Sequence, residues 1–147
     1  MASRTAAGVV GKPRSSAALG TYYRSRSKAF LEAHGYQVAI LERMMWIRRP
    51  GKPCAICARP DMFPTKSDQF ASDLLAVKDD AVEFVQVKFG RTNIAAGVRE
   101  FRKFVFPPFV RQVLHVWEER ARAPEIIDCA TYALPPDRRR QSRETLF

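Results

Sequence analysis

Three polar residues mark the open end of what reads as a β-hairpin. The segments SDLLAV and VEFVQV have the composition of β-strands, and Asp79-Asp80 between them fits a two-residue turn. Antiparallel pairing about that turn sets Asp73 opposite Gln86, with Cβ atoms roughly 5 Å apart. Because side chains alternate along a strand, Lys88 lies on the same face as Gln86. The spacing predicts a cluster of an acid, an amide and an amine.

Such a cluster suits chemistry on phosphates. The Asp73 carboxylate, the Gln86 amide oxygen and the Val87 backbone carbonyl are hard oxygen donors, which Mg²⁺ or Mn²⁺ prefers. A bound ion of this kind polarises a phosphate and lowers the pKa of a bound water. Lys88 could orient that water or stabilise negative charge in the transition state. The alternative is a surface hairpin with a polar rim, in which Asp73 is solvated and Lys88 extends into solvent.

The elements around the hairpin predict a mixed α/β sheet with helices packed against it. A helix is expected over residues 19–34, stopped by Gly35, and a strand over 36–41. The expected buried stripe of this helix is Leu19, Tyr22, Tyr23, Phe30 and Ala33. A second helix is expected over 92–105, capped by Thr92 or Asn93, with a buried stripe of Ile94, Val98, Phe101 and Val105. Strands over 111–118 and 125–133 complete the order α-β-β-β-α-β-β.

The chain divides into three expected parts. Residues 1–18 read as a flexible basic arm, 19–133 as one domain, and 134–147 as a basic tail. Within the domain, residues 42–70 are rich in proline and are expected to form a long loop or insert, which is often functional. Its apolar MMWI segment could extend the first strand or cover the core.

The charge balance implies a polyanionic partner. The formal net charge is +10, and no acidic residue precedes Glu32. Nucleic acid is the favoured partner, with an anionic membrane surface as a weaker alternative and improved solubility as a third reading. No stretch has the length of a membrane span or a signal peptide, so a cytoplasmic protein is expected. Three cysteines also argue against a secreted disulfide scaffold.

The cysteines and histidines offer a second, weaker hypothesis. Cys54 and Cys57 have the CxxC spacing of zinc ligands, and two copies of the chain could share one tetrahedral structural zinc. The alternative is a reduced pair on a surface loop. Cys129 is expected to be a small buried apolar residue, and His115 a packed strand residue rather than a catalytic base.

The ordered segments FLEAHGYQV, SDLLAV and EFVQVKFG together resemble the archaeal-type Holliday junction resolvases and their phage and bacterial relatives, within the PD-(D/E)xK nuclease superfamily. The resemblance covers roughly residues 20–130. It implies a restriction-endonuclease-like fold, with a mixed sheet core in αβββαβ order flanked by helices. It also implies a metal-dependent homodimer that resolves four-way DNA junctions by paired nicks. If a phage encodes the chain, the protein is expected to act in the cytoplasm of the host.

The resemblance assigns roles to four residues. Asp73 matches the metal-binding aspartate, and Lys88 matches the catalytic lysine. Gln86 stands where the family usually has glutamate, which keeps an oxygen donor but removes a negative charge. Ser67 lies near the position of a family serine on a mobile loop close to the metal.

The first helix departs from the family pattern. By the family's spacing, its metal-binding glutamate corresponds to Arg24. Glu42, Asp68 or Glu83 would have to substitute, or the metal would be held by fewer ligands. Strand alternation puts Glu83 on the opposite face from Gln86.

DNA binding is expected to depend on backbone contacts and therefore on shape. The expected contact residues are Arg24, Arg26, Lys28, Lys66, Arg91 and Arg99. The alternative functions are another nicking or repair endonuclease of the same superfamily, or a catalytically weak protein that binds DNA.

Overall fold

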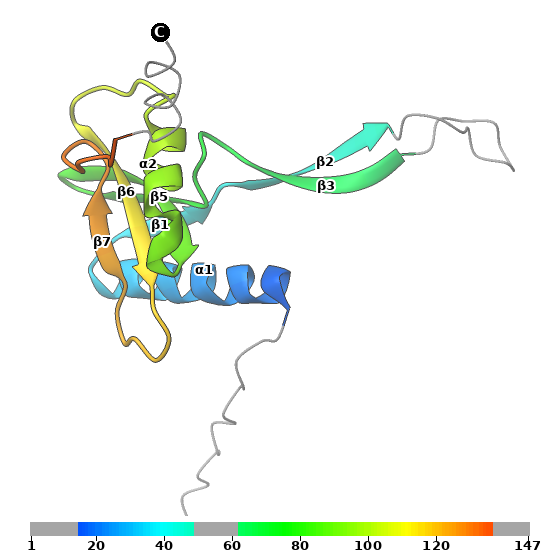
Figure 1. The fold of residues 1–147 in the computed structure, drawn as a ribbon, viewed down its shortest axis with the longest axis horizontal. Helices are drawn as coiled ribbons and strands as arrows, with labels where there is room; N and C mark the ends of the chain where they lie inside the picture. Colours follow the sequence, from blue (N-terminus) through cyan, green and yellow to red (C-terminus); the bar gives the residue numbers. More distant parts are fainter. Residues whose placement is uncertain (1–14, 49–61, 137–147) are drawn as a thin grey trace, which may run out of the picture.

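A five-stranded mixed sheet forms the centre of the molecule (Figure 1). The computed structural model describes residues 15–48 and 62–136. The strand order is β1-β4-β5-β6-β7, in which β5 and β6 are parallel and the other neighbours are antiparallel. The strands are β1 (Gln37–Ile40), β4 (Leu74–Lys78), β5 (Ala81–Phe89), β6 (Val110–Trp117) and β7 (Glu125–Asp128).

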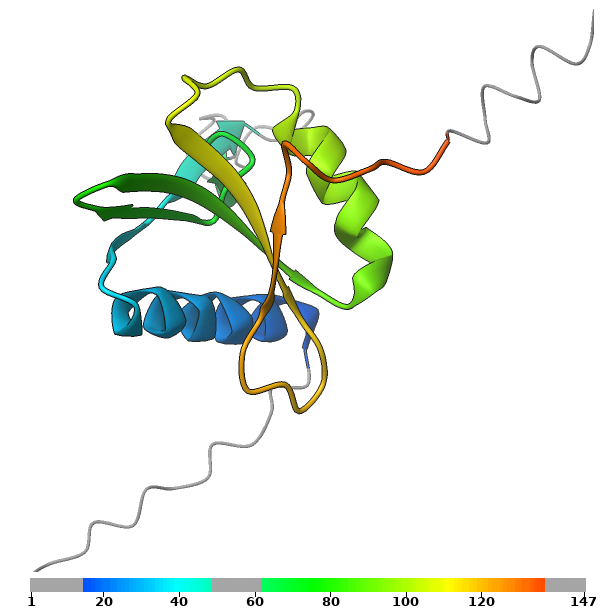
Figure 2. The same cartoon turned by 90° about the vertical axis from the view of Figure 1, so that its left-hand side faces the viewer.

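The two faces of this sheet are covered by different helices (Figure 2). Helix α1 (Ser16–Ala33) packs Leu31 against Leu74, Ala76 and Val85. Helix α2 (Ile94–Phe101) provides the crossover that parallel β5 and β6 require. Its apolar face joins a second core cluster made of Ile94, Val98, Phe101, Leu114, Val116, Ile127 and Cys129. The main-sheet elements follow the order α-β-β-β-α-β-β, so the expected restriction-endonuclease-like class, a mixed sheet flanked by helices, is confirmed.

The register of the central hairpin is also as expected. Leu74 pairs with Val85 and Lys78 pairs with Ala81, about a turn at Asp79-Asp80. Residue numbers in each pair add to 159, and one face of β5 therefore carries Gln86 and Lys88.

Helix α1 differs from the expectation at its start and in its buried face. It begins at Ser16 rather than Leu19 because the Ser15 hydroxyl accepts a hydrogen bond from the Ala18 N–H (3.2 Å). Gly35 ends it as expected, with a φ of +86° that favours glycine. Ala33 is exposed, contrary to prediction, and Ser27 is fully buried instead. The reason is a tertiary contact, since the Trp117 Nε1–H donates to the Ser27 hydroxyl over 2.7 Å.

Both α2 and β7 end several residues before the positions expected from the sequence. Helix α2 stops at Phe101, and Val105 is 97% exposed rather than part of the buried stripe. Asn93 occupies the cap position without a side-chain hydrogen bond. Strand β7 ends at Asp128, whose carboxylate accepts a hydrogen bond from the Ala130 N–H (2.9 Å) and so turns the chain.

The expected loop over 42–70 is wrong in its described parts. Strands β2 (Glu42–Arg48) and β3 (Met62–Asp68) pair antiparallel as a separate two-stranded ribbon that projects from the body (Figure 1). The MMWI segment neither extends β1 nor covers the core, and Pro64 is tolerated because the ribbon strands are edges. Cys54 and Cys57 lie outside the described residues, so the zinc hypothesis stays a prediction.

Neither α1 nor α2, the helices within residues 15–48 and 62–136, combines the length and apolar character needed to cross a membrane.

Gly97 is required where α2 approaches the sheet. A Cβ at this position would lie 2.9 Å from Gln86 Oε1 and 3.1 Å from a Leu114 methyl carbon. We expect Gly97→Ala to lower the free energy of unfolding by about 1–2 kcal/mol, because overpacking outweighs the gain in helix propensity. Gly20→Ala in α1 is the matched control, since nothing lies within 4 Å of its Cβ position, and it should stabilise by up to about 1 kcal/mol. Urea unfolding measures both, and a neutral Gly97→Ala would contradict the close approach.

His115 makes the fold sensitive to acid. Its side chain is fully buried, neither ring nitrogen has a hydrogen-bond partner within the described structure, and burial lowers its pKa to about 4. An unfolded chain takes up the proton near pH 6.5, so stability is lost as the pH falls from there towards 4. When the pH is lowered from 8 to 4, we expect the free energy of unfolding of His115→Leu to rise relative to that of wild type by about 3 kcal/mol. Urea unfolding at both pH values measures this, and an unchanged difference would contradict it.

Candidate functional site

A polar cavity of about 230 Å³ lies between α1, the base of the ribbon and the open end of the central hairpin. It brings together three carboxylates and one guanidinium from four separate segments of the chain. Its lining residues are Ala17, Gly20, Thr21, Arg24, Glu42, Asp68, Asp73 and Val87.

Asp73 is held at the edge of the sheet by its own hydrogen bonds. Its N–H donates to the Val85 carbonyl (2.9 Å), and its Oδ2 accepts from the Val87 N–H (2.7 Å). The chain reaches this position through Phe70 and Ala71, which both have positive φ values (54° and 55°). This conformation is costly for residues other than glycine and redirects the chain from β3 into β4. The sheet therefore places the Asp73 carboxylate where β4 begins.

Negative charge accumulates in this cavity. Burial is the main reason that the pKa of Asp73 is raised, and the nearby charge of Asp68 raises it further. The pKa of Asp68 is also raised, first by burial and then by the charge of Glu42. Lys88 and Arg24 act in the opposite direction on both aspartates. A cation bound among these carboxylates would favour their charged forms.

The ribbon supplies the acids that the first helix lacks. Arg24 faces the cavity, and its guanidinium lies 2.7 Å from a Glu42 carboxylate oxygen. Glu42 and Asp68 are partners in the ribbon register, at its base. Glu83, the third acid considered as a substitute, is elsewhere: it accepts hydrogen bonds from Tyr36 (3.1 Å) and Arg111 (2.8 Å).

Gln86 and Lys88 point towards α2, where they share Glu100. The buried Gln86 Nε2 donates to Glu100 Oε2 (3.0 Å), and Lys88 Nζ lies 4.0 Å from the same oxygen. Gln86 Oε1 is buried without a hydrogen-bond partner among the described atoms. Neither side chain lines the cavity, although Lys88 is close enough to influence both aspartates. Sequence reasoning missed Glu100, because helix periodicity marks it only as a solvent-facing acid.

Ser67 lies on the other face of the ribbon from Asp68. Its hydroxyl donates to the Met45 sulfur (3.4 Å), and it is not among the residues that line the cavity. Its catalytic role stays a prediction, without support from this position.

The donors in the cavity fit a hard divalent cation that keeps water ligands. Within residues 15–48 and 62–136, no three acidic, histidine or cysteine side chains are grouped closely enough to hold a metal by themselves. Mg²⁺ commonly takes only one or two protein carboxylates and completes its octahedron with water and substrate phosphate. Asp73 and Asp68, with the Val87 backbone beside them, satisfy that smaller requirement.

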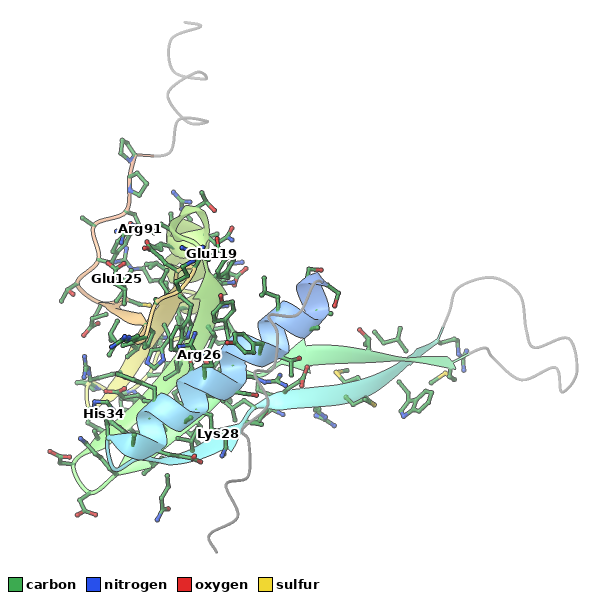
Figure 3. The ribbon with its side chains drawn as sticks, turned by 90° about the horizontal axis from the view of Figure 1, so that it is seen from below. Arg26, Lys28, His34, Arg91, Glu119 and Glu125 are labelled. Atoms are coloured by element: carbon green, nitrogen blue, oxygen red, sulfur yellow. The ribbon has the colours of Figure 1, made fainter. Side chains whose placement is uncertain are left out.

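Three of the predicted DNA-contacting residues are labelled in Figure 3, where Arg26 and Lys28 lie on α1 and Arg91 lies beside Glu125. Arg26 stacks over the Trp117 ring (4.3 Å) and donates to the Ala121 carbonyl (2.9 Å). Lys28 pairs with Glu32, and Arg91 pairs with Glu125. Arg99 is exposed on α2, and Lys66 occupies the ribbon position opposite Met44. Of the predicted residues whose side chains the structure describes, only Arg24 lines the cavity.

Comparisons with known proteins find a similar fold among solved structures. No protein-family model matches the sequence, and no curated protein does so either. The fold is similar to that of a Holliday junction resolvase from the archaeal hyperthermophile Archaeoglobus fulgidus, with 15% sequence identity and a TM-score of 0.44. The match covers 80% of this chain and 78% of the resolvase. This similarity concerns the fold alone.

The raised pKa of Asp68 predicts a stabilising substitution. A carboxyl whose pKa is higher in the folded state holds its proton more tightly there, so stability falls as the pH rises through that range. We expect Asp68→Asn to be more stable than wild type at pH 7 in a chelator, and the difference to vanish near pH 3. Asp79→Asn, an equal charge change in the β4–β5 turn, is the control. Asp68→Asn that is less stable than wild type at pH 7 would contradict the electrostatic description.

Proposed function

We propose that this protein is an endonuclease dependent on Mg²⁺ or Mn²⁺ that cleaves branched DNA. The observation that carries the proposal is the convergence of Asp68, Asp73 and Arg24 on one cavity, in a chain with a formal net charge of +10. Carboxylates bind the ion, the guanidinium binds a phosphate, and the excess positive charge attracts the DNA backbone.

The residues have distinct roles in this proposal. Asp73 and Asp68 would hold the ion with the Val87 carbonyl. The chemistry that the ion would supply is activation of a water and neutralisation of phosphate charge. Arg24 lies in the same cavity and can pair with a phosphate in place of Glu42. Lys88 stabilises negative charge on the reacting phosphate from the adjacent strand face. Gln86 joins the metal only if its amide leaves Glu100.

The resemblance of the hairpin and helix segments extends the proposal to four-way junctions and a homodimer. Two identical subunits present two sites related by a twofold axis, as paired nicks in a junction require. Apolar surface for self-association is present between α2 and β6, where Val105 is 97% exposed and Phe109 is 71% exposed.

A second function is favoured by the contacts of Gln86 and Arg24. The Gln86 amide is occupied by Glu100, and Arg24 stands where the resemblance requires an acid. Both features weaken a metal site, so the second candidate is a protein that binds branched DNA with little cleavage.

Cleavage of a labelled four-way junction tests the endonuclease. We expect paired nicks in Mg²⁺ or Mn²⁺ and none in EDTA, with Asp73→Asn and Lys88→Ala each reducing the rate at least about 100-fold, since each removes a charge at the reacting phosphate. Asp79→Asn should retain wild-type activity. Linear duplex of the same sequence distinguishes a resolvase from a general nuclease, which would cut both equally.

Metal binding is measured separately by thermal unfolding. Added Mg²⁺ should raise the melting temperature of wild type at pH 8 and leave Asp73→Asn unchanged, because only a cation that binds the folded state stabilises it. Junction binding without cleavage or any metal-dependent shift would favour the second candidate.

A further inference from the structure

We propose that one face of the β2–β3 ribbon binds unpaired nucleotides of the DNA, with Trp46 stacked on a base. This inference rests on the proposed function and assigns its substrate preference. The site face of the ribbon is defined by the β2 residues Glu42, Met44, Trp46 and Arg48.

The site face leads directly out of the cavity. Side chains alternate along β2, so the residues at 42, 44, 46 and 48 share one side of the ribbon. At its base, Glu42 pairs in register with Asp68, and both line the cavity. At about 3.3 Å per residue, Trp46 lies about 13 Å along the strand from Glu42. That distance corresponds to a few nucleotides, so a strand bound in the cavity reaches Trp46.

The exposure of this face requires an explanation. Trp46 is 63% exposed and Met44 is 60% exposed, whereas Trp117 in the sheet is only 1% exposed. A two-stranded ribbon has no core of its own, so its apolar side chains remain exposed to water unless a partner covers them. Exposed aromatic and apolar groups beside a polar site are typical of a binding surface.

Charge and shape favour a nucleic acid strand over a second copy of the chain. Arg48 lies on the site face at the end of the apolar stretch of β2, and the chain as a whole is strongly basic. The site face also continues into a cavity that holds Arg24 for a phosphate. An indole presents a flat surface that matches an unstacked base, and it has no equivalent partner in an intact duplex. The substrate should therefore carry unpaired or unstacked bases beside the cleaved phosphate, as at a branch point or flap.

Tryptophan fluorescence and affinity test the inference together. Trp117 is buried, hydrogen-bonded to Ser27 and covered by Arg26. Since the chain has two tryptophans, fluorescence quenching on addition of DNA therefore reports Trp46. We expect flapped DNA with a few unpaired nucleotides to quench the full-length protein in EDTA, and matched blunt duplex to do so weakly. Trp46→Ala should weaken binding of flapped DNA at least about fivefold, with duplex affinity changed less than about twofold. Trp46→Phe should retain most of the affinity, because a phenyl ring still stacks.

Ile47→Ala is the matched control. Ile47 is the next residue of β2, is 42% exposed and points to the other face, so its loss should leave the preference for flapped DNA unchanged. Equal effects of the Ile47 and Trp46 variants would overturn the inference. A drop in oligomeric mass of Trp46→Ala in light scattering, with unchanged DNA affinity, would also overturn it by making the ribbon a subunit interface.

The outcomes separate the inference from the proposed function. If Trp46→Ala cleaves DNA in metal at the wild-type rate and with the wild-type preference, the inference about the ribbon is wrong and the proposed endonuclease activity is retained. Binding that depends on Trp46, without cleavage in any metal, would remove the endonuclease and keep the ribbon as a reader of unpaired DNA. Wild type that binds no DNA would overturn both.

Discussion

The hydrogen bond from the Val87 N–H to the Asp73 carboxylate organises this protein. The pairing of β4 with β5 ends at Leu74 and Val85. Beyond it, the Asp73 carboxylate takes the place of a strand carbonyl as the acceptor for the Val87 N–H. That substitution fixes the carboxylate at the edge of the sheet, beside α1 and the base of the ribbon. Burial of an acid at this position is costly, and the bond to the Val87 N–H offsets part of the cost.

The cavity built around that bond combines unfavourable charges. Glu42, Asp68 and Asp73 are drawn together from three segments. The pKa values of the two aspartates are raised, first by burial and then by the neighbouring carboxylate charge. Arg24 relieves the repulsion through its pair with Glu42. Such a cluster of carboxylates favours a bound cation or a cationic side chain among them. Functional sites commonly gather like charges in this way at a cost in folding stability.

The central hairpin was predictable because its signals are local. Two alternating strands around Asp79-Asp80 fix a register, and that register carries Gln86 and Lys88 to a common face. The α2 stripe over Ile94, Val98 and Phe101 was likewise recognisable from its period. The ribbon was not, because the pairing of Glu42 with Asp68 joins residues 26 positions apart across a proline-rich stretch that reads as a loop. Ser27 was missed for a similar reason, since its partner Trp117 lies 90 residues away.

The sequence by itself therefore determined the fold class, the hairpin register, the basic character and the polar residues that we propose act on phosphate. Propensity, alternation and charge act over a few residues and leave a readable pattern. Only the tertiary structure decided that Glu42 and Asp68 join Asp73 beside Arg24, and that Gln86 and Lys88 turn to Glu100. Such choices depend on how distant segments pack and on which charges share a buried space, and no local pattern encodes either.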